Sequence, residues 1–301
     1  MASEAKPVRA PAVAVRPVPR ESLLNPWPEL SARRIITIVV VVVVLLWSLN
    51  GTNANLGTLA EGVPNMADFV VRLFPPRFDL APAAIAVPAP LQGTLGETVT
   101  LTIPRVVPYL VETLQMAFIG TLLGVVLALP FGLLAARNVA PRPWIYTVTR
   151  LLLNINRAIP DIIFALIFVA AVGLGPFGGV LALGVGAIGT LAKLYAESIE
   201  AIDPQQTLAV RATGASPLQT FRYGVLPQAL PLMASYTLLL FESNVRSATI
   251  LGLVGAGGVG FILSKYISLF QYRELMGALI FIIVMVTLID WLSGLLRKRL
   301  I

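Results

Sequence analysis

The chain contains no cysteine and no histidine. Their absence excludes disulfides, thiolate chemistry, imidazole acid–base catalysis and most zinc sites. Charged residues are also scarce, at 12% of the 301 residues, which is about half the share found in a soluble domain. The remaining residues form no convincing nucleophile–base pair, so we do not expect an enzyme.

Hydrophobic residues make up 57% of the chain, and the few charges are clustered, which leaves long uncharged runs. An α-helix needs about 20 apolar residues to cross a bilayer. We therefore predict an all-α, multi-pass protein of the cytoplasmic membrane, in contact with lipid. The net charge of +7 could suggest nucleic acid. Lys and Arg collect on the cytoplasmic loops of membrane proteins, so we expect no nucleic-acid partner.

Four regions are expected along the chain. Residues 1–30 hold six prolines and no hydrophobic periodicity, which predicts a disordered cytoplasmic tail. Residues 31–51 predict a first transmembrane helix. Residues 52–108 predict an extracytoplasmic loop that contains a short interfacial helix at 66–74. Residues 109–301 predict the core domain of the protein.

Five further transmembrane helices are predicted in the core domain. They cover residues 109–136, 144–173, 180–195, 225–254 and 275–296. Six spans in total place the N- and C-termini in the cytoplasm, beside the loop at 137–150, and the placement of arginines agrees with that count. Before the core, residues 99–103 indicate a strand.

A polar stretch from Ala201 to Pro227 separates the fourth and fifth predicted spans. Asp203 can cap a first helix, Gly214 can end it, and Ser216 can cap a second helix. Small side chains, which let another protein approach closely, recur at Ala209, Ala212 and Ala215. The pattern predicts a rigid helix–glycine–helix unit that contacts a partner.

The spacing of this stretch resembles the cytoplasmic coupling loop of permeases from ATP-binding-cassette (ABC) importers. That loop reads Glu-Ala-Ala, three residues, Gly, nine residues, Ile, one residue, Leu-Pro. Here Gly214 is followed twelve residues later by Leu226-Pro227, while Leu208-Ala209-Val210 replaces Glu-Ala-Ala and Gly224 replaces Ile. Four further segments resemble the phosphonate-importer subfamily of these permeases. They are residues 112–115, the segments that end at Asn138 and at Pro160, and Tyr236 to Gly260.

The resemblance implies a type I ABC importer permease fold, with about six transmembrane helices and a cytoplasmic coupling helix. It implies a membrane subunit that forms the path for phosphonate, or for a related oxyanion such as phosphite or phosphate. The implied partners are a second copy of the permease, two ATPase subunits that bind ATP and Mg, and a soluble substrate-binding protein outside. No cofactor or metal is expected on this chain. The implied ATPase-coupling residues are Asp203, Leu208, Ala209, Ala212, Gly214, Ala215 and Pro227.

Three polar residues, Glu242, Asn244 and Arg246, lie inside the fifth predicted span. A charge at the centre of a transmembrane helix costs on the order of 2.5 to 3.5 kcal/mol, so such residues usually face the bundle interior or a water-filled path. One hypothesis is that Arg246 meets the oxyanion, Asn244 donates a hydrogen bond and Glu242 orients the arginine. The alternative is a structural i,i+4 pair of Glu242 and Arg246. Three further charges at span ends are interpreted as solvated or helix-capping, namely Asp161, Lys193 and Asp290.

Three glycines, Gly255, Gly257 and Gly260, match the pattern G-x-G-x-x-G. That pattern indicates dinucleotide binding only after a strand in a βαβ unit. Here a membrane-length helix precedes it, so we interpret the segment as a flexible turn at the outer gate of the path.

Two other classes of protein were weighed. An ion-coupled secondary transporter of small anions predicts internal repeats and several intramembrane acids, and the chain has neither. An intramembrane hydrolase predicts a nucleophile and a base, which the composition does not supply.

Overall fold

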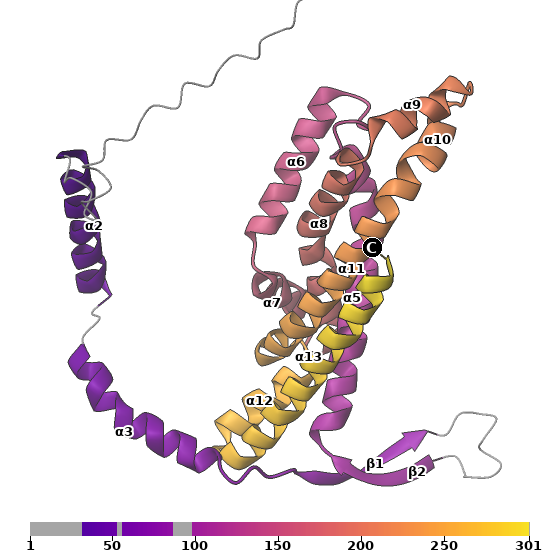
Figure 1. Cartoon of the computed structure of the whole chain (residues 1–301). Helices are drawn as coiled ribbons and strands as arrows, with labels where there is room; N and C mark the ends of the chain where they lie inside the picture. Colours follow the sequence, from indigo (N-terminus) through magenta and orange to yellow (C-terminus); the bar gives the residue numbers. More distant parts are fainter. Residues whose placement is uncertain (1–31, 53–55, 87–97, 301) are drawn as a thin grey trace, which may run out of the picture. The chain divides into compact units, whose positions relative to one another are not determined.

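The computed structural model describes residues 32–52, 56–86 and 98–300 (Figure 1). The chain divides into two compact units, Met1–Met66 and Ala67–Ile301, which we describe separately. The tail predicted for residues 1–30 lies outside the described residues. In the first unit, helix α2 covers Ala32–Gly51 and is apolar along most of its length, which suits a helix that crosses a membrane. Helix α3, Leu56–Leu73, crosses the boundary and is longer than the helix predicted at 66–74.

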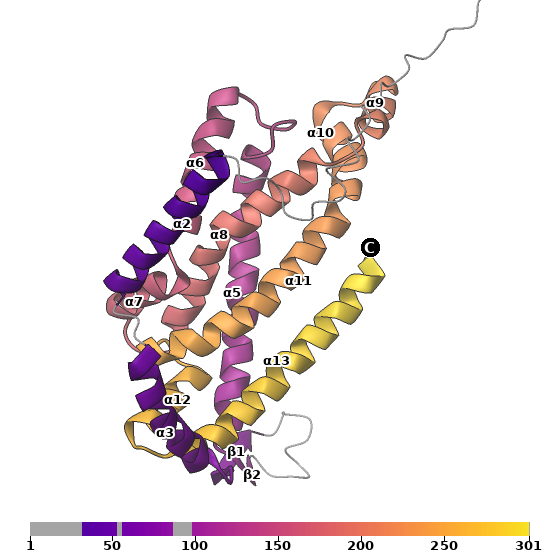
Figure 2. The ribbon, with the colours of Figure 1, turned by 60° about the vertical axis from the view of Figure 1, so that its left-hand side comes forward.

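The core of the second unit is built on α5 (Val106–Leu134) and α8 (Pro176–Glu200), which pack along their length. Glycines of α5 bring the two helices together. A Cβ added at Gly120 would lie 2.8 Å from the Cβ of Leu183, and one at Gly124 would lie 2.9 Å from the Cβ of Ala187. Such close approach is the usual way in which helices associate in a membrane. Helix α11 (Leu226–Leu251) packs on both of them (Figures 1 and 2).

The third predicted span, residues 144–173, is not one straight helix. It consists of α6 (Pro143–Ala158) and α7 (Asp161–Val172), which meet at an angle of 83°. Pro160 causes the break, because proline cannot donate the backbone hydrogen bond that would continue α6. Asn156 fixes the bend by donating to the Val185 carbonyl, at 3.1 Å, and accepting from the Gly189 amide, at 2.8 Å.

Beyond α11, the chain forms a 3₁₀ turn (Gly252–Val254), α12 (Val259–Ser268) and α13 (Tyr272–Leu300). Sequence reasoning missed α12, which has only ten residues and follows the glycine-rich turn. Among the described residues, five helices are long and apolar enough to cross a membrane, or six if α6 and α7 count as one broken span. The all-α polytopic fold with about six spans is therefore confirmed.

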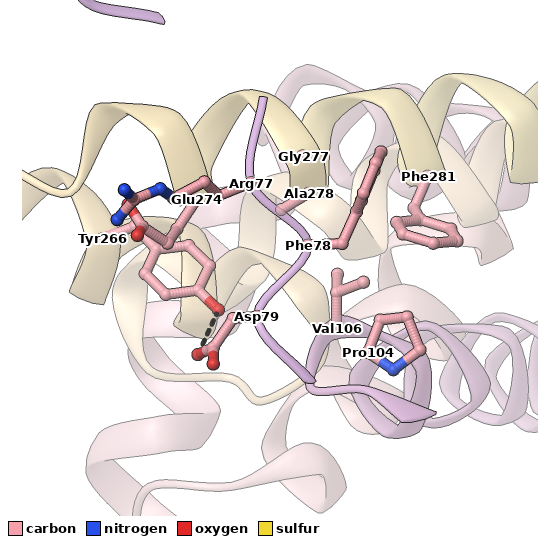
Figure 3. Close-up of a pocket in the computed structure, with 10 residues that line it drawn as sticks. All are labelled: Arg77, Phe78, Asp79, Pro104, Val106, Tyr266, Glu274, Gly277, Ala278 and Phe281. Carbon is pink, nitrogen blue, oxygen red and sulfur yellow. Dashed lines mark hydrogen bonds between the residues drawn. The ribbon is translucent and has the colours of Figure 1, made fainter. Parts of the chain in front are cut away.

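The segment between α3 and α5 contains an antiparallel hairpin of β1 (Leu80–Ala86) and β2 (Thr98–Pro104). The strand predicted at 99–103 is β2, whereas β1 was not predicted, because alanine and proline dominate it. The segment before β1 crosses the start of α13, where the Arg77 amide donates to the Arg273 carbonyl at 2.9 Å (Figure 3). Gly277 makes room for this crossing, since an added Cβ would collide with the Arg77 carbonyl.

Asp79 fastens the hairpin to α12. Its carboxylate lies 3.4 Å from Nε of Arg105 and accepts a hydrogen bond from the Tyr266 hydroxyl, also at 3.4 Å (Figure 3). Burial raises the pKa of Tyr266 to about 12, and the charge of Asp79 acts in the same direction. The phenol therefore keeps its proton at neutral pH and remains a donor to Asp79.

Candidate coupling and translocation site

The predicted helix–glycine–helix unit is present between α8 and α11. The first helix, α9 (Pro204–Ala212), is capped by the Asp203 side chain, which accepts from the Gln205 amide at 2.9 Å. Gly214 has a φ of +82°, a conformation that favours glycine. The second helix, α10 (Pro217–Thr220), begins with a capping box of Ser216 and Gln219. Each of these backbone features agrees with the sequence-based prediction.

The second helix, α10, continues into the long helix α11. A π-helical turn, Phe221–Val225, joins α10 to α11, so that Pro217–Val254 forms one helical segment of 38 residues. Pro227 has no amide hydrogen, and it lies in the first turn of α11 rather than closing the unit. Gln228 then ties the segment to α9, because its amide oxygen accepts from the Asp203 amide at 3.0 Å. This contact was not predicted from the sequence.

The outer surface of this unit has small side chains and a depression. No residue of α9 is buried, and Leu208 is 53% exposed. The depression is lined by Ala209, Val210, Thr213, Gly214, Ala215, Gln219 and Tyr223. Three of the predicted coupling residues, Ala209, Gly214 and Ala215, line this depression, whereas Leu208 lines a separate pocket. Asp203 caps the start of α9, and Pro227 lies in the first turn of α11.

A polar cluster holds α5, α6 and α8 together at the end of α8, directly before the helix–glycine–helix unit. Glu200, the last residue of α8, accepts from the Arg137 amide at 2.7 Å and forms an ion pair with Arg150 at 2.9 Å. Arg150 also donates to the Ala135 carbonyl at 3.1 Å and lies over the ring of Tyr146. A glutamate is unfavourable at the C-terminus of a helix. These contacts offset its position and fix the ends of α5 and α8 to the middle of α6.

A second polar cluster lies between α11 and α13, and we call it the α11–α13 charge cluster. It contains Glu242 and Arg246 of α11 and Asp290 and Arg297 of α13. Arg246 lies 3.4 Å from Glu242 and 3.4 Å from Asp290, and Arg297 lies 3.1 Å from Glu242. The predicted pair of Glu242 and Arg246 is therefore present. The interpretation of Asp290 as a solvated charge is wrong, because its carboxylate is bonded to Arg246.

Asn244 does not belong to this cluster. It is 4% exposed and donates to the hydroxyl of Thr121 on α5 at 2.9 Å. Glu242 and Arg246 lie on one face of α11, and Asn244 lies on the face that packs against α5. The other two charges were interpreted as solvated or helix-capping. Asp161 is the first residue of α7 and accepts from the Ser247 hydroxyl at 3.0 Å, which joins α7 to α11, and Lys193 lies half-buried on α8.

The glycine-rich turn after α11 is held at several points rather than flexible. Gly255 and Gly257 have φ values of +86° and +80°. Glu112 and Thr113 of α5 accept from the amides of the two residues that follow, Gly258 at 3.0 Å and Val259 at 2.8 Å. Gly260 touches Gly252 across the turn, since an added Cβ would lie 2.8 Å from the Cα of Gly252. The turn is a packed crossing of two chain segments, and the elements directly before it are α11 and a 3₁₀ turn rather than a strand.

Comparison with known proteins identifies the class. Residues 128–301 match the family described as binding-protein-dependent transport system inner membrane component, and the chain belongs to this family. It is the transmembrane subunit of an ABC importer, a multi-pass inner-membrane protein that works with ATPase subunits and a substrate-binding protein. The permease is not itself an enzyme, and ATP is used by its partners.

Several relatives are named as permeases for phosphite or phosphate. The chain is 45% identical to the phosphite transport system permease protein PtxC of Stutzerimonas stutzeri, over 63% of this chain and 69% of that protein. It is 38% identical to the putative phosphite transport system permease protein HtxC of the same organism, over 79% and 77%. It is 44% identical to the phosphate-import permease protein PhnE of Mycolicibacterium smegmatis, over 63% of this chain and 36% of that longer protein.

Solved structures agree with the fold. The permease chain of an inward-facing MetNI methionine ABC transporter matches 71% of this chain and all of its own length, with a TM-score of 0.58 and 26% identity. The predicted resemblance to phosphonate-importer permeases, and the type I importer fold that it implied, are both confirmed.

Proposed function

We propose that this permease conducts a phosphorus oxyanion of the phosphite, phosphonate or phosphate class. The observation that carries the proposal is the identity of 38 to 45% with permeases named for phosphite and phosphate. The α11–α13 charge cluster supports it, because it places an arginine inside a transmembrane segment. A guanidinium offers paired donors that match an oxyanion.

We assign the contact with the oxyanion to Arg246. Its side chain is 49% exposed, whereas that of Glu242 is 14% exposed and accepts from Arg246 and Arg297. Glu242 therefore orients the arginine and does not meet the cargo. Asn244 lies on the opposite face of α11 and stabilises the path by fixing α11 to Thr121 of α5.

Coupling is proposed to run through the exposed surface of α9 and α10. Closure of the ATPases would push this surface, and the continuous helix from Pro217 to Val254 would carry the displacement into the membrane. At its other end, Gly255, Gly257 and Gly260 form the outer turn, which the contacts with Glu112 and Thr113 keep aligned with α5. The outer gate would then move with α5 and α11 as a unit.

The assembly is proposed to contain two permease chains, with a second copy of this one as the partner. Two putative phosphite permeases, HtxC and HtxE, come from one organism, so a distinct second subunit is the competing arrangement. Native mass spectrometry of the purified complex separates the two, since a single permease mass is expected here.

Both termini and the coupling unit are proposed to lie in the cytoplasm. A cysteine introduced at Ser216 should resist an impermeant maleimide added to intact cells, whereas one at Asn65 should react. The assay is clean because the chain has no cysteine of its own. Permeabilised cells provide the control, in which both sites should react. Reaction of Ser216 in intact cells would reverse the orientation.

The transport function is tested in proteoliposomes that contain the permease, its ATPase and its binding protein. We expect ATP-driven uptake of at least one of labelled phosphite, methylphosphonate and phosphate. The double variant Glu242→Gln/Arg246→Gln removes one acid and one base. Arg297 and Asp290 lose their partners, but they carry opposite charges and keep the cluster neutral, so the variant should assemble and should lose most of that uptake. Near-normal uptake per assembled complex would make the pair structural and place the oxyanion contact elsewhere. Absence of uptake of all three anions by the wild-type complex would refute the substrate class.

A further inference from the structure

The α11–α13 charge cluster is a chain of four side chains in the order Arg297, Glu242, Arg246, Asp290. Two of its three contacts cross between the helices, at 3.1 Å for Arg297 with Glu242 and 3.4 Å for Arg246 with Asp290. The two carboxylates differ in their surroundings. Glu242 is shared by two arginines, whereas Arg246 is the one cation within 4.0 Å of Asp290 in the described part of the chain. Asp290 is thus the dedicated counter-ion of Arg246.

Arg246 uses little of its hydrogen-bonding capacity. Its bonds to Glu242 and Asp290 both start from Nη1, and both are long, at 3.4 Å. Among the hydrogen bonds of residues 32–52, 56–86 and 98–300, none starts from Nε or Nη2 of Arg246. These two nitrogens form the edge of a guanidinium that binds an oxyanion with two parallel hydrogen bonds. A half-exposed arginine with this edge unused can take an anion without first losing Glu242.

Asp290 is the member of the cluster that can leave most easily. Its side chain is 41% exposed, against 14% for Glu242, and its single contact with Arg246 is at the long end of the hydrogen-bond range. The contact between Arg297 and Glu242 is shorter and more buried, so it can hold α11 to α13 while Asp290 moves.

We infer that Asp290 is a displaceable counter-ion for Arg246, which the cargo oxyanion replaces during transport. This inference rests on the proposed function of Arg246. With the path empty, Asp290 neutralises an arginine that would otherwise be costly inside the membrane. When the oxyanion binds, it neutralises Arg246 in place of Asp290, and Asp290 is released. The carboxylate then competes with the cargo for Arg246, which keeps binding weak enough for the anion to leave, as conduction requires.

The inference predicts a specific failure for Asp290→Asn in the complete importer. The complex should assemble in normal amounts, because Glu242 and Arg297 remain paired. Arg246 would lack its competitor and hold an anion for longer, so maximal uptake of the anion carried by the wild type should fall by about tenfold, within the range of ordinary coupling between sites. Inorganic phosphate inside the proteoliposomes should inhibit the variant at lower concentration than the wild type. Asp290→Glu should restore most of the uptake.

Two further variants make the test decisive. Glu274→Gln removes another carboxylate from α13, at its outer end, and should leave uptake and phosphate inhibition unchanged. In the background of Arg246→Gln, adding Asp290→Asn should have no further effect on uptake, because Asp290 acts only through Arg246.

Wild-type uptake and phosphate sensitivity in Asp290→Asn would overturn the inference while leaving the proposed function in place. Loss of assembled complex in Asp290→Asn would also overturn it, because the residue would then be a brace between α11 and α13. Failure of the wild-type complex to transport any of the three anions is a different result, and it removes the proposed function itself.

Discussion

Gly214→Pro is expected to reduce ATP-driven uptake to background while the protein still inserts into the membrane and assembles. Gly214 has a φ of +82°, and proline is confined to a φ of about −65°. Proline would also remove the hydrogen bond from the Gly214 amide to the Arg211 carbonyl, at 3.0 Å. The turn between α9 and α10 would therefore change shape, and the surface offered to the ATPase with it. Uptake and ATPase activity of reconstituted complexes, per mole of assembled permease, measure the effect.

Two companion variants separate the effect of changing the shape of the turn from the effect of adding a side chain. Gly214→Asn should keep much of the uptake, because asparagine tolerates the left-handed region better than other residues with a Cβ. Ala212→Trp keeps the turn but places a large ring on the exposed surface, so it should uncouple ATP hydrolysis from uptake. Normal uptake in the proline variant would show that this turn does not transmit the movement of the ATPase.

Gly260→Val is expected to prevent folding of the core domain rather than to impair transport alone. A Cβ at Gly260 would collide with the Thr249 carbonyl and lie 2.8 Å from the Cα of Gly252. These are backbone atoms of the crossing between α11 and α12, so no rotamer change can relieve the contact, and the cost should exceed the roughly 1 to 3 kcal/mol of ordinary overpacking. The yield of monodisperse protein in detergent should fall to a small fraction of the wild-type yield.

Gly294→Val is the matched control, because Gly294 lies in α13 and an added Cβ there would meet nothing within 4 Å. Its yield should stay close to that of the wild type. A normal yield and melting temperature for Gly260→Val would mean that the crossing opens at little cost, and the turn would then be the flexible gate that the sequence suggested.

The amino-acid sequence predicted the elements whose signals are local. Apolar runs marked the spans, and Asp203, Gly214 and Ser216 marked the coupling unit, because caps and positive φ depend on neighbouring residues. The 83° break after α6 was missed although Pro160 was visible, since a proline can also be accommodated by a kink within one helix. The hairpin strand β1 was missed because alanine and proline dominate it and because its partners on β2 lie 12 to 24 positions away.

In the candidate site, too, local contacts could be predicted from the sequence and contacts between helices could not. Glu242 and Arg246 could be paired from their spacing of four residues. Their partners on α13 lie 44 and 55 positions away in the chain and depend on how the two helices pack. A signal did exist, since Asp290 and Arg297 are seven residues apart and therefore share one face of α13. Considered with the i,i+4 pair on α11, that face was a candidate for the second half of the cluster. Asn244 was misplaced although a signal existed, because residues two positions apart in a helix do not share a face and Asn244 therefore could not join Glu242 and Arg246.

The continuity of the helix from Pro217 to Val254 sets the scale of movement at the charge cluster. Arg246 lies 21 residues beyond the π-helical turn, a distance of about 32 Å at the 1.5 Å rise of an α-helix. A rotation of only about 5° about that turn would displace Arg246 by about 3 Å. That shift is comparable to its 3.4 Å separation from Asp290. An angular change too small to open a gate by itself would therefore suffice to separate the two charges.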